Sequence, residues 1–151
     1  MACSFCATGK LGLIRNLDSH EIIDQVMWAV HHLAREDRKL RNIVYMGMGE
    51  PLLNYTKVAD SINVVCNQKK LDLSNRRITV STCGIAPRIV DFARDFPQVS
   101  LAVSLHAPND DARKRIMPVE DTYPIDVLMT SIDEYVAITN KRVFYEYIMI
   151  N

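Results

Sequence analysis

The sequence lacks the features that would assign it to several large classes of protein. It holds no apolar run near the roughly 18 residues that a membrane-spanning helix needs. The start, Met1 to Cys6, leads straight into a polar and charged segment, so no secretory signal peptide is predicted and the expected location is cytoplasmic. Low-complexity tracts, linkers and close internal repeats are also missing. These absences predict one globular domain with no membrane partner.

An excess of charge of either sign is missing too. Lysine plus arginine and aspartate plus glutamate number 18 each, so the net charge is zero with neutral histidines. With 48% hydrophobic and 24% charged residues, the composition is that of an ordinary globular protein. Net charge therefore does not indicate a nucleic-acid partner, although a neutral protein can still carry a local basic patch.

Two short basic groups bear on that question. One holds the four basic residues between Lys69 and Arg77, and the other runs from Arg113 to Arg115. Solvated surface is the simpler interpretation of both groups. The alternative is contact with RNA phosphates, which set affinity rather than sequence choice. On that alternative, replacing Arg113 and Arg115 by alanine weakens RNA binding and flattens its salt dependence.

Cysteines are few. The chain has Cys3, Cys6, Cys66 and Cys83, a set that indicates metal or reactive chemistry before disulfides in a reducing compartment. Only Cys3 and Cys6 form a motif, C-x-x-C, whose spacing lets two thiolates reach one metal ion or cluster. A zinc site needs two more ligands, and the sequence offers no second C-x-x-C and no His-x-x-x-His pair. A zinc or redox dithiol protein using these two cysteines stays open as an alternative.

What the sequence does contain is a regular alternation of helical and strand patterns. Helices are predicted at Ser19 to Ala34 with Ser19 as N-cap, Val58 to Val65, Pro87 to Phe96 and Ile125 to Ile138, with a short turn at 110–115. Strands are predicted at 42–46, 77–81, 99–103 and 143–150. Continuous apolar strands separated by helices indicate an α/β fold with a parallel sheet covered by helices.

Polar residues and glycines follow three of these strands. They lie at Gly47 to Pro51, at Ser81 to Gly84 and at Ser104 to Asp110. Binding sites of α/β proteins gather at the carboxyl ends of the strands, so the three segments are expected to meet at one rim.

Two of these segments carry specific chemistry. Glycines at 47 and 49 let the backbone approach a ligand closely, and the carboxylate of Glu50 could pair with an ammonium group. Ser104 and His106 alternate, so both can offer hydrogen bonds on one side of a strand end. The plainer alternatives are a strand-to-helix turn with an exposed glutamate and a structural histidine.

Three motifs in order carry a resemblance to a known family. They are Cys3 to Lys10 with Arg15 to Leu17 after it, Gly47 to Leu52, and Ser104 to Asp110. The sequence resembles the bacterial radical S-adenosylmethionine RNA methyltransferases, which methylate adenine C2 in 23S rRNA and, in many members, in tRNA. The resemblance extends over essentially all 151 residues. A sister group that methylates adenine C8 shares much of the pattern.

The resemblance implies a partial (β/α) barrel of the radical SAM type that binds a 4Fe–4S cluster and S-adenosylmethionine. Cys3 and Cys6 match the second and third of the three cysteines that bind the cluster. The first cysteine would precede Met1, and the cysteine that carries the methyl group would follow Asn151, so no catalytic residue is assigned within the chain. Cys83 is the one candidate for a replacement ligand.

The resemblance also implies cofactor contacts. Gly49 and Glu50 match the segment that holds the amino group of S-adenosylmethionine. Ser81 matches a second contact, and the stretch of Ser104, Leu105 and His106 matches a third.

By the same resemblance, residues 1–151 are expected to form one core fragment, cut at both ends and without its first strand. Apolar surface next to the first predicted strand would then be uncovered, and solubility would be poor. The implied partners are 23S rRNA, tRNA and an electron donor protein such as flavodoxin, and the implied state is a monomer. A non-catalytic α/β module that binds S-adenosylmethionine without a cluster is the other alternative.

Overall fold

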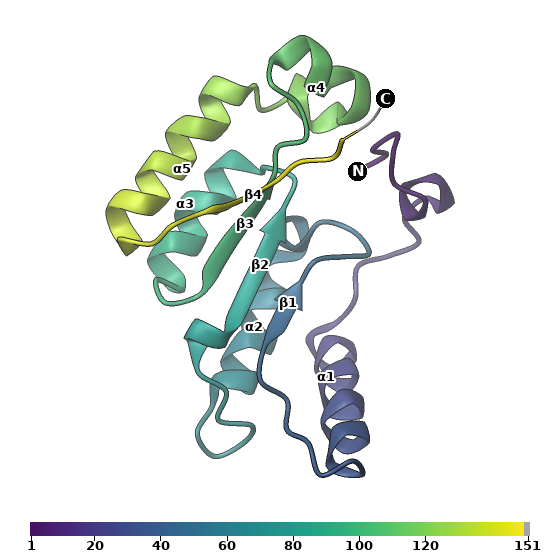
Figure 1. Cartoon of the computed structure of the whole chain (residues 1–151), viewed down its shortest axis with the longest axis vertical. Coiled ribbons are helices and arrows are strands. Elements are labelled where there is room, and N and C mark those ends of the chain that lie inside the picture. Colours follow the sequence, from purple (N-terminus) through teal and green to yellow (C-terminus); the bar gives the residue numbers. More distant parts are fainter. Residues whose placement is uncertain (150–151) are drawn as a thin grey trace.

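Four strands form one parallel sheet in the order β1-β2-β3-β4 (Figure 1). The computed structural model describes residues 1–149. Within them, the strands are β1 (Ile43–Tyr45), β2 (Ile78–Thr82), β3 (Ser100–Ser104) and β4 (Phe144–Glu146). Parallel neighbours need a crossover between them, and helices provide it here. The predicted α/β class with a parallel sheet is confirmed.

Five α-helices and four short 3-10 turns connect the strands in the described part of the chain. The helices are α1 (Ser19–Ala34), α2 (Tyr55–Cys66), α3 (Ala86–Asp95), α4 (Asp110–Ile116) and α5 (Ile125–Thr139). The turns are η1 (Thr8–Leu11), η2 (Pro51–Asn54), η3 (Asn75–Arg77) and η4 (Pro118–Asp121). None of these helices is long and apolar enough to cross a membrane.

Most predicted bounds lie within one residue of the observed ones, whereas α2 begins at Tyr55, three residues before its predicted start. Two further differences have a physical reason. The N-cap of α1 is Asp18 rather than Ser19, because the carboxylate of Glu21 accepts a hydrogen bond from the Asp18 backbone at 2.8 Å and completes a capping box. The last predicted strand, 143–150, pairs only over Phe144–Glu146, since register with β3 stops opposite Ser104. Residue 150 lies outside the described residues.

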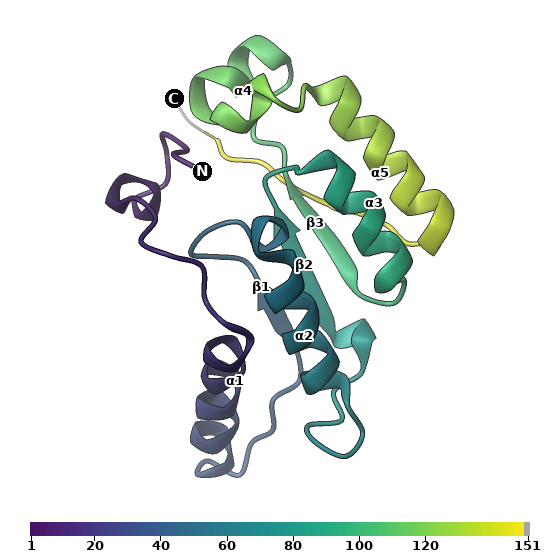
Figure 2. The ribbon, with the colours of Figure 1, turned by 180° about the vertical axis from the view of Figure 1, so that it is seen from behind.

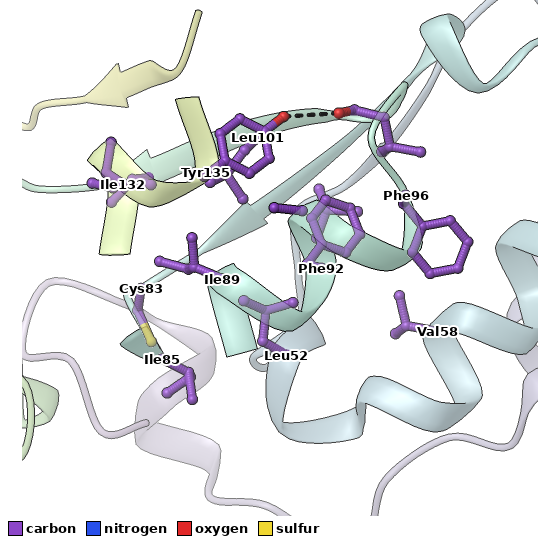
Figure 3. Packing of buried hydrophobic residues seen from close by; sticks show 14 of the residues in the cluster. Leu52, Val58, Cys83, Ile85, Ile89, Phe92, Phe96, Leu101, Ile132 and Tyr135 are labelled. Carbon is purple, nitrogen blue, oxygen red and sulfur yellow. Dashed lines mark hydrogen bonds between the residues drawn. The ribbon is translucent and has the colours of Figure 1, made fainter. Parts of the chain in front are cut away.

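The core lies between the sheet and the three helices α2, α3 and α5, which cover one face of it (Figure 2). Ile89 and Phe92 of α3 and Ile132 and Tyr135 of α5 are fully buried or nearly so, and Figure 3 shows them packed together. The hydroxyl of Tyr135 donates to the Val99 carbonyl at 2.9 Å, so the one polar atom of this aromatic side chain is satisfied.

The edge strand β1 is much less covered than the strands beside it. A cavity of about 570 Å³ separates it from α1, which has no buried residue. Val44 is 53% exposed, Met46 59% and Met48 85%. The expected uncovered apolar surface beside the first predicted strand is therefore confirmed.

Candidate functional site

Near the carboxyl ends of β2, β3 and β4, the face of the sheet opposite α2, α3 and α5 carries small and polar side chains. Side chains alternate between the two faces of a strand, so burying Val80 and Leu101 against the helices turns Ser81 and Ser104 the other way. In the register of the sheet, Ser104 lies opposite Glu146 of β4. Three neighbouring strands thus present oxygen atoms on one face, near their carboxyl ends.

These three side chains form one hydrogen-bonded cluster. The Ser104 hydroxyl donates to the Glu146 carboxylate at 2.7 Å, and the Ser81 hydroxyl lies 3.2 and 3.3 Å from its two oxygens. Ser81 and Ser104 were expected from the sequence, whereas Glu146 was not. A carboxylate in the middle of the apolar run 143–150 was the available signal. Its register with Ser104 could not be read from the sequence.

Glu50 lies at the other side of the same rim, where it fixes the loop after β1 to the end of β2. Its carboxylate accepts hydrogen bonds from the Leu52 backbone at 2.9 Å, the Thr82 hydroxyl at 2.8 Å and the Cys83 backbone at 2.7 Å. A carboxylate offers about four lone-pair positions, so roughly one is left for a ligand. That position can accept a hydrogen bond from a cationic group such as an ammonium.

Gly49 precedes this carboxylate in a conformation that favours glycine, with φ at +126°. No atom lies within 4 Å of the place where a Cβ would stand at either Gly47 or Gly49. The loop therefore exposes its backbone next to Glu50, and a ligand can approach that backbone closely.

The predicted metal ligands Cys3 and Cys6 lie on a tight turn. The Cys6 backbone donates to the Cys3 carbonyl at 3.1 Å, and a Cβ added at Gly9 would stand 3.5 Å from the Cβ of Cys6. Both side chains are partly exposed. The Ser4 backbone donates to the Ile116 carbonyl at 2.9 Å, which attaches the turn to the end of α4.

The cysteine turn also contacts the predicted segment after β3. The Phe5 ring packs edge-on against His106, with ring centroids 4.8 Å apart. Burial lowers the pKa of His106, and its Nδ1 accepts a hydrogen bond from the Ile148 backbone at 3.2 Å. The neutral ring therefore carries its hydrogen on Nε2. The backbones of Leu105 and His106 both donate to the Glu146 carbonyl, at 3.1 and 3.2 Å.

Cys83 does not join the pair of cysteines. Its thiol is buried, and burial together with the Glu50 carboxylate raises its pKa well above the ordinary value. Within residues 1–149, no three histidine, cysteine, aspartate or glutamate side chains are placed to hold a metal ion. The structure thus offers two thiols to an iron–sulfur cluster, and a closed zinc site is not formed by these residues.

The burial of Arg113 contradicts the hypothesis that this residue binds RNA phosphates. Its side chain is fully buried and forms an ion pair with the buried carboxylate of Glu120. It donates to the carbonyls of Cys83 at 2.7 Å, Leu105 at 3.1 Å and Ser104 at 3.4 Å. The guanidinium therefore joins the carboxyl ends of β2 and β3. Arg115 is exposed at the surface of α4, so only that half of the hypothesis stays a prediction.

All the predicted site residues thus gather at the carboxyl ends of the strands, at the upper right of Figure 1. Two thiols, an exposed glycine backbone beside a carboxylate, and a pair of hydroxyls sharing a second carboxylate lie along one rim. This donor set fits a group that combines iron, an ammonium and sugar hydroxyls.

Known proteins resemble this chain in sequence and in fold. The family model of the Radical SAM superfamily matches residues 1–150. A crystal structure of a radical SAM methyltransferase from Sphaerobacter thermophilus superposes with a TM-score of 0.94 at 46% identity, covering 97% of this chain and 43% of that one. The radical SAM type of fold is thereby confirmed.

Curated relatives carry the name "Probable dual-specificity RNA methyltransferase RlmN". The one from Fervidobacterium nodosum is 47% identical over 150 residues, which are 98% of this chain and 42% of that protein. The one from Spiroplasma citri is 43% identical over 150 residues, or 99% of this chain and 44% of that protein. The chain therefore spans less than half the length of the curated relatives it matches.

Proposed function

The chain belongs to the radical SAM superfamily, which uses a 4Fe–4S cluster and S-adenosylmethionine, and from this we propose that it is the cofactor-binding core of an RNA methyltransferase. The proposed reaction is methylation of adenine C2 in 23S rRNA and tRNA. The names of the relatives support RNA as the substrate, and their identity of 43–47% supports a shared reaction. When bound, the cofactors supply the one-electron chemistry that a carbon of low nucleophilicity requires.

We assign Cys3 and Cys6 to the cluster as two of its thiolate ligands. Both lie on one tight turn with partly exposed side chains, and the Ser4 and Phe5 contacts hold that turn against α4 and His106. Thiolates are the usual ligands of iron–sulfur clusters.

The amino group of S-adenosylmethionine is assigned to Glu50 and the open backbone at Gly49. Because three hydrogen bonds already orient the Glu50 carboxylate, it does not have to reorganise when the ammonium arrives. This pre-oriented carboxylate beside an open glycine backbone is the observation that carries the proposal.

The ribose hydroxyls are assigned to Ser81, Ser104 and Glu146. A carboxylate accepts from two hydroxyls at once, and each serine can also accept when its own hydrogen is directed to Glu146. Leu105 and His106 support this set, since their backbones hold the Glu146 carbonyl in place.

Calorimetric titration of the chain with S-adenosylmethionine tests these assignments. Replacing Glu50 or Glu146 by glutamine is expected to weaken binding at least about ten-fold, because each change removes a charged hydrogen-bond acceptor worth roughly 1.5–3 kcal/mol. Glu134→Gln is the matched control, since this carboxylate pairs only with Arg94 on the exposed face of α5. Equal affinities in all three variants would refute the assignment, provided that circular dichroism shows each one folded.

Iron and sulfide content after anaerobic reconstitution tests the cluster ligands. Iron is expected to bind to the unchanged chain and to Cys66→Ala, and to be lost in Cys3→Ala and Cys6→Ala. Zinc bound in place of iron by Cys3 and Cys6 would favour the dithiol alternative. Binding of S-adenosylmethionine by a folded chain that takes up no iron would favour the non-catalytic module.

The remaining expectations stay predictions. They are the single core fragment over residues 1–151, the monomeric state, the flavodoxin-like electron donor and the cytoplasmic location. The choice of C2 over C8 rests on the resemblance alone.

A further inference from the structure

The basic residues of this neutral chain are concentrated at the amino ends of the strands. Four connections lead from a helix into a strand, at 35–42, 67–77, 96–99 and 140–143. They contain ten of the 18 lysine and arginine residues but three of the 18 acidic ones, a net charge of +7. Because the whole chain is neutral, the rest of it carries a net charge of −7.

These connections form one continuous surface. We call the basic residues of 35–42, 67–77 and 140–143 the amino-end basic surface. The amino ends of parallel strands lie at the same edge of a sheet, here along the lower left of Figure 1. Arg76 donates to the side chain of Gln98 at 3.1 Å, and Lys141 donates to its carbonyl at 2.6 Å. A small cavity lined by both Arg38 and Leu73 joins the first two connections.

The cations of this surface lack the carboxylates that neutralise cations elsewhere in the structure. Among the described residues, one of the ten forms an ion pair, Arg38 with Glu36. Of the eight lysine and arginine residues outside the surface, six form ion pairs. Nine of the ten are exposed, and the tenth, Lys141, has its pKa lowered by burial and by the charge of Arg76. Like charges held together without partners repel each other, so a bound polyanion would relieve a cost that the fold alone does not.

We propose that the amino-end basic surface binds the phosphate backbone of the RNA substrate, away from the base that is methylated. This inference rests on the proposed function for the choice of RNA. A five-residue strand such as β2 is about 17 Å long, so the surface and the candidate site can contact one RNA at two separated points. Contacts of this kind position the RNA without reading its sequence.

A membrane surface is a poorer match for these residues. Basic segments that lie on a membrane also direct apolar side chains outward. Here Leu40, Leu71, Leu73 and Val143 are all partly buried, and Phe96 is buried. Apart from Pro97, the exposed side chains of the connections are therefore polar, as phosphate contact requires.

Fluorescence anisotropy with a labelled RNA hairpin of about 20 base pairs, at roughly 50 to 200 mM KCl, tests the proposal. The test variant combines Lys69→Gln, Lys70→Gln and Arg77→Gln, whose side chains form no ion pair in the structure. Removing three phosphate contacts is expected to flatten the slope of log Kd against log[KCl] by about 2 to 3 and to weaken binding at least about ten-fold at 100 mM.

The matched control combines Lys57→Gln, Arg88→Gln and Arg94→Gln, which removes the same charge from exposed sites outside the surface. Its slope is expected to stay within about one unit of the unchanged chain. Equal slopes of log Kd against log[KCl] in the two variants would overturn the proposal. It would also be overturned if the unchanged chain did not bind the RNA but bound phosphatidylserine vesicles. Either result leaves the proposed function unaffected if S-adenosylmethionine and iron still bind. If S-adenosylmethionine and iron do not bind but RNA does, the proposed function is refuted and the proposal for the amino-end basic surface stands.

Discussion

Charged side chains are buried and paired at the carboxyl end of the sheet, but exposed and mostly unpaired among the described residues at its amino end. At the carboxyl end, Arg113 is buried against Glu120 and three carbonyls, and Glu50 is held by three hydrogen bonds. At the amino end, nine of ten cations form no ion pair within residues 1–149. Buried, paired charges fix atoms in place, whereas exposed, unpaired charges act over about 8–10 Å of salt solution. The carboxyl end is therefore built for defined geometry and the amino end for attraction.

Arg113→Ala is expected to have the largest effect on the free energy of unfolding. It leaves the Glu120 charge buried without a partner and removes the donor shared by β2 and β3, so the expected loss is about 3–5 kcal/mol in urea unfolding. Arg115→Ala, two residues along the same helix and exposed, is expected to cost less than about 0.5 kcal/mol. Similar losses of unfolding free energy in the two variants would show that the buried ion pair at the carboxyl end of the sheet does not stabilise the fold more than an exposed charge does.

Gly84→Ala is expected to have the second-largest effect on the free energy of unfolding. Gly84 has φ at +106°, and an added Cβ would stand 3.0 Å from Leu128, so strain and crowding together predict a loss of about 2 kcal/mol. At the amino end, Asp72 also has a positive φ, at 51°. Asp72→Gly is expected to change the free energy of unfolding by less than about 0.5 kcal/mol. A tolerated Gly84→Ala in thermal unfolding would mean that the carboxyl end is not tightly packed.

The smallest effect is expected from neutralising the amino-end basic surface. The combined change of Lys69, Lys70 and Arg77 to glutamine relieves repulsion, so it is expected to raise stability by a few tenths of a kcal/mol at low salt. The gain should vanish near 1 M salt, where the screening length falls to about 3 Å. A destabilised variant would show that these cations have structural partners.

The fold could be predicted well because hydrophobic periodicity reports which face of an element is buried. The predicted span 19–34 matches α1 apart from the residue that caps it, and the four predicted strands all occur. The last strand was predicted too long, since apolar sequence continues beyond Glu146 while pairing with β3 does not. Where a strand stops pairing is decided by its neighbour and not by its own residues.

The site could be predicted only in part. Local motifs predicted Cys3, Cys6 and Glu50, because glycine and cysteine spacing is visible in one stretch of sequence. Glu146 was missed because its partners lie 42 and 65 residues away. The grouping of basic residues at the amino ends of the strands was not visible in the sequence for a related reason, since a parallel sheet collects them from connections far apart in sequence.

Arg113 shows the opposite error. In sequence it stands among Arg113-Lys114-Arg115 and reads as one member of an exposed group. Its burial depends on Glu120 and on carbonyls at two strand ends, none of which a run of three basic residues indicates. A helix turns each of its residues in a different direction, so adjacent like charges need not share an environment.

Because β4 is attached twice through Glu146, its opening should depend on whether a ligand is bound at the rim. Within residues 1–149, only three residues of β4 pair with β3, and Glu146 anchors them through both its carboxylate and its carbonyl. A ligand that takes over the two serine hydroxyls changes how firmly these three residues are held, so the opening of β4 is thermodynamically linked to occupancy of the rim. Amide hydrogens of 144–146 should consequently exchange at rates that follow the concentration of the cofactor, even with no RNA in solution.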